Sequence, residues 1–269
     1  MDKGGSVPRR TRLPAPLAPV VVVAGMTAML LVARPAFALG LRPALLLSEL
    51  TLILPGLLAM AALGVPLASG LALNPIGSRA ALFVAATAAA LWVASLGLFE
   101  LQYALWAPPP GYLEAFERLH EALRPKNAAD ALLSVLAIAA APAVCEELLL
   151  RGIVLSSLLP AIGGAAAVTT SAALFALIHL DPYRSAFTFA LGLALGALRV
   201  RSGSLLAPIL AHALVNTITF AAAPFTDDLS AGLPEPRPLL GVALLAAGGA
   251  LTFFLMRRVG VVDSTRAAA

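Results

Sequence analysis

Charged residues and cysteine are both scarce in this chain. Only 12% of its 269 residues are Asp, Glu, Lys or Arg, whereas a soluble globular domain has about 25%. Cysteine occurs once, as Cys145, so no disulfide framework can form within the chain. Histidine occurs three times, and no His-Glu-x-x-His zinc motif is present. These absences exclude an ordinary soluble domain and a disulfide-stabilised scaffold.

Hydrophobic residues make up 60% of the sequence, and the mean hydropathy is +0.94. Such a composition provides several segments of about 20 apolar residues, the length that crosses a bilayer. We therefore predict an all-α polytopic membrane protein with about eight transmembrane helices. The predicted spans are 15–38, 44–68, 80–106, 128–158, 163–180, 185–200, 204–222 and 238–256.

The net charge is +4 and the pI is near 9.8, values that also suit a nucleic-acid-binding protein. The basic residues lie instead at the ends of apolar runs, where they act as topology signals. We therefore expect the lipid bilayer and no nucleic acid as a partner. Their distribution favours a cytoplasmic N-terminus.

We expect one polytopic domain over 15–258, between a basic cytoplasmic tail (1–14) and a C-terminal tail (259–269). Between the third and fourth spans, residues 112–126 place Leu113 and Phe116 at helical spacing on one face. This pattern predicts an amphipathic helix in the membrane interface. Its His120 is interpreted as a surface histidine.

Three charged residues lie within the fourth predicted span. Glu146 and Glu147 are adjacent, and Arg151 follows the second by four residues. A charge at the centre of a bilayer costs about 3 kcal/mol, so such residues persist when they are paired, hydrated or used in chemistry. Glu147 and Arg151 can pair on one helix face, which leaves Glu146 to face a hydrated cavity. The alternative is a purely structural polar cluster between helices.

Two histidines follow in later apolar segments. His179 comes one helical turn after Phe175, and His212 shares a helix face with Asn216. Each pair taken alone fits a hydrogen bond between helices. Together with Glu146 they supply the parts for peptide hydrolysis without a serine or cysteine nucleophile. A carboxylate and an imidazole can activate water, and a second imidazole and an amide can stabilise the oxyanion.

The predicted depths of Glu146 and His179 in the membrane are hard to reconcile with a shared site. In the predicted topology Glu146 falls in the inner half of the fourth span, whereas His179 lies near the outer end of the fifth. The two can meet only if the fourth span extends beyond the membrane or the fifth begins deep within it.

The order Glu-Glu-x3-Arg, Phe-x3-His, His-x3-Asn on successive apolar segments resembles the CPBP family, the CAAX-protease and bacteriocin-processing (Abi) intramembrane peptidases. The motifs extend over about 70 residues, within 128–222. The resemblance implies a glutamic endopeptidase in which Glu146 and His179 activate water. It also implies an oxyanion hole of His212 and Asn216. Supporting roles fall to Glu147, Arg151 and Phe175.

Other interpretations of the polar residues are weaker. Two histidines and a glutamate can ligate zinc, but zinc would occupy groups needed to position water, so we expect no metal and no cofactor. Cys145 lies in an apolar setting that disfavours a nucleophile. Glu49, Glu100 and Arg34 lie near predicted span ends and are expected to be peripheral. Asp181 is expected to end a helix, although it can also orient the histidine two residues before it.

The expected function is hydrolysis of a peptide bond near the membrane-proximal end of a membrane-anchored protein or peptide. The resemblance allows prenylated CAAX tails, bacteriocin leaders, membrane regulators or C-terminal sorting signals as substrates. A sequence rich in Ala, Leu, Pro and Arg is bacterial in style, which favours the inner membrane and disfavours prenylated substrates. A non-catalytic immunity factor and an ion- or proton-coupled transporter are the alternatives. Polar residues confined to spans four, five and seven favour the enzyme.

Overall fold

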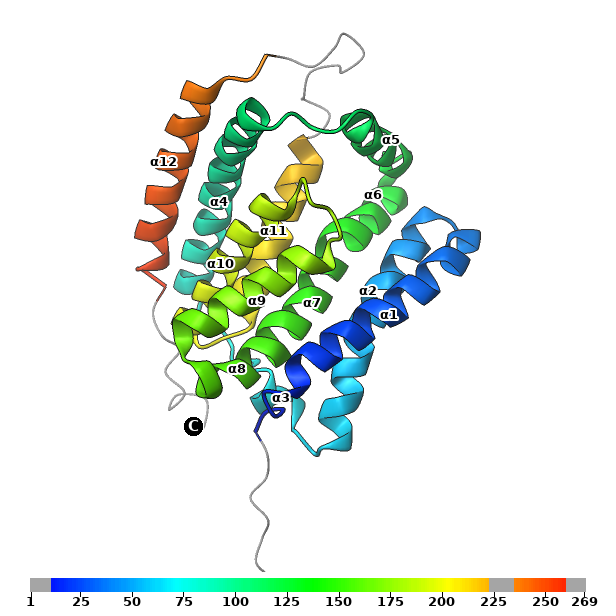
Figure 1. Cartoon of the computed structure of the whole chain (residues 1–269), viewed down its shortest axis with the longest axis vertical. Helices are drawn as coiled ribbons and strands as arrows, with labels where there is room; N and C mark the ends of the chain where they lie inside the picture. Colours follow the sequence, from blue (N-terminus) through cyan, green and yellow to red (C-terminus); the bar gives the residue numbers. More distant parts are fainter. Residues whose placement is uncertain (1–10, 223–234, 260–269) are drawn as a thin grey trace, which may run out of the picture.

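A computed structural model describes residues 11–222 and 235–259, and all regular structure in these ranges is helical (Figure 1). The predicted all-α polytopic fold is confirmed. Most of the predicted N-terminal tail (1–10) and of the predicted C-terminal tail (260–269) lies outside the described residues.

One helical hairpin, a short helix, a long helix and a further helix form the N-terminal part. The hairpin consists of α1 (Leu17–Ala36), the 3-10 turn η1 (Phe37–Leu39) and α2 (Leu41–Ala62), and the helices that follow are α3 (Leu67–Gly70), α4 (Ser78–Leu105) and α5 (Tyr112–Leu123). A single rod follows, in which α6 (Ala128–Val135), α7 (Ala141–Glu147) and α8 (Leu155–Ile162) are joined by the π-helical segments η2 (Leu136–Ala140) and η3 (Leu148–Val154). The chain ends with α9 (Gly164–Ile178), α10 (Ser185–Ser202), α11 (Leu206–Ala222) and α12 (Pro238–Met256).

Each of the eight predicted spans coincides with one of these helices or with the α6–α8 rod. By length and composition, five are able to cross a membrane: 17–39, 41–62, 78–105, 128–162 and 238–256. Helices α9 and α11 are apolar but shorter, with 15 and 17 residues. The predicted amphipathic helix is present as α5, with an exposed polar face and Leu123 buried.

Small residues allow several helices to approach closely. A Cβ atom added to Gly248 of α12 would lie 2.5 Å from the backbone nitrogen of Ala94 in α4. Likewise, a Cβ atom on Gly56 of α2 would lie 2.7 Å from the side chain of Ile153 in η3. This is the packing expected where helices associate without water between them.

A tight turn at Gly163 joins α8 to α9. Its φ of +79° is a left-handed conformation that favours glycine. Glu146 precedes this turn by 17 residues and His179 follows it by 16. With a rise of about 1.5 Å per residue, both residues lie about 25 Å from the turn. The rod packs against α9 through α8 and η3, and Arg151 of the rod contacts Phe175 of α9, so Glu146 and His179 lie beyond this contact by similar lengths of helix.

Candidate active site

The acidic pair sits where the rod changes its helical geometry. Glu146 and Glu147 are the last two residues of α7, and the π-helical segment η3, which contains Arg151, begins immediately afterwards. Such widened turns are frequent at functional sites. Glu146 is only 7% exposed, while Glu147 and Arg151 are fully buried.

Arg151 is held by groups from three elements. Its Nη1 donates to Oε1 of Glu147 at 2.8 Å, as the spacing of four residues predicts. Its Nη2 donates to the carbonyl oxygen of Gly192 in α10 at 3.0 Å. The guanidinium carbon lies 4.6 Å from the ring centre of Phe175 in α9. The Arg151 side chain therefore fixes the rod against α9 and α10.

His212 of α11 contacts both glutamates. Its Nδ1 lies 3.1 Å from Oε1 of Glu147, and its Nε2 lies 3.8 Å from Oε2 of Glu146. Because Oε1 of Glu147 also accepts from Arg151, this oxygen acts as a carboxylate acceptor and the proton belongs on Nδ1. The Nε2 distance is too long for a direct hydrogen bond. His212 is thus oriented by Glu147 with its second nitrogen toward Glu146.

His179 is the residue that caps the C-terminal end of α9, and it is half-buried. Its Nδ1 lies 2.7 Å from the carbonyl oxygen of Phe175. A carbonyl only accepts, so Nδ1 carries the proton and Nε2 of the neutral ring keeps its lone pair. The two histidines therefore present different hydrogen-bonding faces.

One buried phenyl ring lies between the two imidazoles. The ring centre of Phe175 is 4.9 Å from that of His179 and 5.6 Å from that of His212, and both contacts are nearly perpendicular. Edge-to-face contacts of this kind are favourable. Phe175 therefore connects all three motifs, because it also contacts Arg151.

Asn216 lies one turn beyond His212 on α11 and is half-buried. Its side chain makes no hydrogen bond to another residue in the described ranges. The amide is therefore not committed to a structural partner among them.

Asp181 does not bond to His179, so the prediction that it can orient this histidine is wrong. Its Oδ1 accepts from the backbone N–H groups of Tyr183 and Arg184, at 3.0 and 3.1 Å. Its Oδ2 accepts from the Tyr112 hydroxyl at 2.6 Å. Burial and this bond to Asp181 raise the pKa of Tyr112, which therefore stays protonated and continues to donate. Asp181 thus ties α5 to the loop that follows α9.

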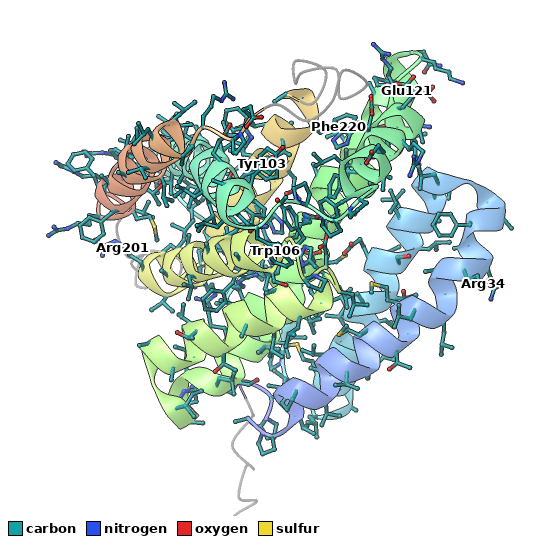
Figure 2. The ribbon with its side chains drawn as sticks, turned by 45° about the horizontal axis from the view of Figure 1, so that its top comes forward. Arg34, Tyr103, Trp106, Glu121, Arg201 and Phe220 are labelled. Atoms are coloured by element: carbon teal, nitrogen blue, oxygen red, sulfur yellow. The ribbon has the colours of Figure 1, made fainter. Side chains whose placement is uncertain are left out.

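Further contacts hold α5 over this end of the site. His120 is half-buried, and its ring stacks on Phe220 of α11 with 6.1 Å between ring centres. Figure 2 shows Phe220 beside the helix that carries Glu121. Tyr112 of α5 packs edge-on against Tyr183, with 4.8 Å between ring centres. His120 is therefore a packing residue rather than the predicted surface histidine.

Glu49 is the site residue that sequence reasoning missed. It is the ninth residue of the 22-residue helix α2, and its Oε2 is buried with no hydrogen-bond partner among the described residues. The expectation that Glu49 is peripheral is therefore wrong. Oε2 of Glu146 likewise has no partner, and the two carboxylates are close enough to interact electrostatically.

Two contacts set the register that brings Glu49 to this place. Nε of Arg42 donates to Oγ of Ser134 at 2.8 Å, near the start of both α2 and the rod. Further along, Gly56 lies against Ile153. The two helices thus run in the same direction, and Glu49 lies midway between these contacts. A signal is present in the sequence, since residues 42, 49 and 56 recur every seven positions and so share one helix face.

The remaining polar candidates are peripheral or packed as expected. Glu100 pairs with Arg237 at 3.0 Å, and Arg34 is exposed. Cys145 is 4% exposed and belongs to the hydrophobic core. Within residues 11–222 and 235–259, no group of three or more His, Cys, Asp or Glu side chains is placed to hold a metal ion.

Comparison with known proteins bears on the same region. Residues 128–218 match a family model described as type II CAAX prenyl endopeptidase Rce1-like. Neither a curated protein nor a solved structure matches the chain. The matched segment begins with α6 and ends within α11, so it contains all three motifs. The match supports the resemblance inferred from those motifs, and over this segment the chain is similar to CAAX-type membrane proteases of the CPBP family.

Proposed function

We propose that the chain is an intramembrane endopeptidase of the glutamic type, which hydrolyses a peptide bond in a membrane-anchored protein or peptide. The observation that carries this proposal is the 3.8 Å separation between Oε2 of Glu146 and Nε2 of His212, which come from different helices. The family-model match over 128–218 supports the protease class, and the arrangement of side chains suggests the role of each residue.

Glu146 and His179 are assigned to water activation, with no metal ion. Oε2 of Glu146 has no hydrogen-bond partner among the described residues, and Nε2 of His179 keeps its lone pair because Nδ1 donates to Phe175. A water held by these two acceptors loses a proton to one of them while its oxygen attacks the peptide carbonyl carbon. The product of this step is a tetrahedral oxyanion.

His212 and Asn216 are assigned to that oxyanion. For Nε2 of His212 to donate while Nδ1 donates to Glu147, the ring must carry both protons. Glu147 offsets the resulting positive charge, and Arg151 holds Glu147 in place. One such donor contributes about 3 kcal/mol to the transition state. The proton taken from water then passes to the amide nitrogen as the C–N bond breaks, which yields a carboxylate and an amine.

Glu49 is assigned a positioning role. Its Oε2 has no hydrogen-bond partner among the described residues, and a proton shared with Glu146 would remove the repulsion between the two acids. Glu49 would thereby fix the orientation in which Glu146 meets water.

The substrate is proposed to be held in the membrane next to the site. Apolar helices surround the catalytic residues, which favours a substrate with a lipid anchor or an apolar segment over a soluble peptide. We propose a C-terminal sorting signal or a leader peptide, processed at the bacterial inner membrane.

The proposal is tested by substrate trapping in cells. Glu146→Gln, His179→Ala and His212→Ala should each cause uncleaved membrane-anchored precursors to accumulate, as detected by comparative membrane proteomics. Glu100→Gln is the matched control, because that carboxylate pairs with Arg237 away from the site, and it should process normally. If all three site variants fold and yet leave every precursor processed, the chain is not a peptidase, and a transporter or immunity factor takes its place.

A further inference from the structure

A second polar site lies at the end of the bundle opposite α5, where α3, α8 and the start of α1 meet (Figure 1). It is a cavity of about 360 Å³. None of the candidate catalytic residues lines it. The residues that do are Thr11, Arg12, Ser69, Gly70, Ser156, Leu159 and Arg199.

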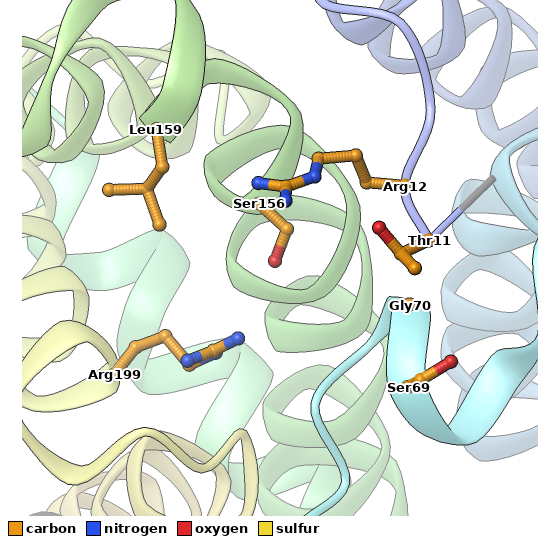
Figure 3. A pocket seen from close by; sticks show the side chains of 7 residues that line it. All are labelled: Thr11, Arg12, Ser69, Gly70, Ser156, Leu159 and Arg199. Atoms are coloured by element: carbon orange, nitrogen blue, oxygen red, sulfur yellow. The ribbon is translucent and has the colours of Figure 1, made fainter. Parts of the chain in front are cut away.

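Arg199 is the residue that makes this cavity unusual. It lies in the last turn of α10, it is only 7% exposed, and its Nε is buried without a hydrogen-bond partner in the described ranges. Figure 3 shows Arg199 and Arg12 reaching toward each other from opposite walls. The ion pairs found in those ranges include neither arginine. A buried guanidinium without a counter-charge is costly, so the arrangement calls for an anion.

The lining matches the chemistry of a phosphate group. Each guanidinium offers a planar set of donors that suits phosphate oxygens. Thr11, Ser69 and Ser156, which carry hydroxyl groups, also line the cavity. No carboxylate lines it, so no negative charge in the lining repels an anion. Leu159 provides an apolar flank, which suits a phosphate that carries an organic chain.

The position of the cavity fits the phospholipid headgroup layer. The helices α8 and α10 both end beside it, and the exposed Arg201 lies two residues after Arg199. Clustered basic residues at one end of a membrane protein mark the cytoplasmic side, where anionic lipids are enriched.

We propose that this cavity is a phosphate-binding site, in which Arg12 and Arg199 hold a phosphate oxyanion between the segment that precedes α1 and the helix bundle. The phosphate belongs to an anionic lipid headgroup or is free in solution. The proposal is independent of the peptidase function, because its residues take no part in the catalytic arrangement.

The test uses the full chain purified in detergent. Native mass spectrometry with added dioleoylphosphatidylglycerol or dioleoylphosphatidylcholine measures lipid retention, and thermal stability is compared in sodium phosphate and in sodium chloride of equal ionic strength. Retention of the anionic lipid alone supports the headgroup source. Stabilisation by inorganic phosphate supports the free ion.

Arg12→Gln and Arg199→Gln should each weaken binding of the supporting anion at least tenfold. Arg79→Gln is the matched control, since Arg79 is exposed and lies outside the cavity, and it should bind as wild type does. Because Arg12 is exposed, its variant keeps the fold even if the Arg199 variant does not. The proposal is overturned if the anions bind no better than phosphatidylcholine and chloride, or if Arg12→Gln binds as tightly as Arg79→Gln.

Discussion

Removing Arg151 alone should destabilise the protein more than removing its charge together with that of Glu147. Both side chains are fully buried, and Nη1 of Arg151 donates to Oε1 of Glu147 at 2.8 Å. Arg151→Met leaves the Glu147 carboxylate in a low-dielectric interior without the arginine, with only the hydrogen bond from His212 to compensate its charge. The expected loss in the free energy of unfolding is about 3–5 kcal/mol, to which the lost contact with Phe175 contributes.

The double variant Glu147→Gln/Arg151→Met removes both charges and leaves no uncompensated ion. It should unfold within about 1–2 kcal/mol of wild type, because neutral replacement of a buried pair is often tolerated. The new amide oxygen can still accept from Nδ1 of His212. The neutral amide of Glu147→Gln does not stabilise a doubly protonated His212 ring, however. Proteolysis by the double variant should therefore be about 10²–10³-fold lower than in the wild type.

Stability is measured by unfolding the purified protein in detergent with increasing SDS, followed by the fluorescence of Trp92 and Trp106. Proteolysis is measured by the accumulation of uncleaved precursors in cells. Arg34→Met, an exposed position, is the control and should unfold as wild type does. If the single Arg151 variant is as stable as the double variant, the buried carboxylate is not left uncompensated and the electrostatic reasoning is refuted.

Two further predictions concern α2 and α12. Glu49→Gln should lower kcat about tenfold with little change in KM, as measured on a trapped substrate, and an unchanged kcat would remove Glu49 from the site. Gly248→Ala should cost about 1–3 kcal/mol of stability in the same SDS titration, because its Cβ would lie 2.5 Å from a backbone nitrogen of α4. Gly249→Ala, whose Cβ would have no neighbour within 4 Å, should be neutral, and equal effects of the two would contradict this packing.

Local features of the sequence were sufficient to predict much of the molecule. Apolar runs are long enough to mark helices regardless of how they pack, so every predicted span coincides with a helix. The pairing of Glu147 with Arg151 follows from helical spacing alone, and so does the shared face of His212 and Asn216. Each of these inferences depends on residues within one element.

The errors concern contacts between elements. The sequence predicts a peripheral Glu49 because hydropathy reports where a span ends, and not which face of a helix meets its neighbour. Its location depends on the register that Arg42 and Gly56 impose between α2 and the rod. The same holds for Asp181, because its partner Tyr112 lies 69 residues away in the sequence.

The length of α9 bears on the depth at which His179 lies. The predicted conflict in depth assumed that each apolar segment crosses the whole bilayer. A helix of 15 residues is about 22 Å long, shorter than the roughly 30 Å of hydrocarbon. If the turn at Gly163 lies at a membrane surface, a helix of this length ends within the hydrocarbon, and His179 does not reach the opposite surface. Beyond its end, the Tyr112 hydroxyl donates to Asp181, which ties α5 to the loop that follows α9.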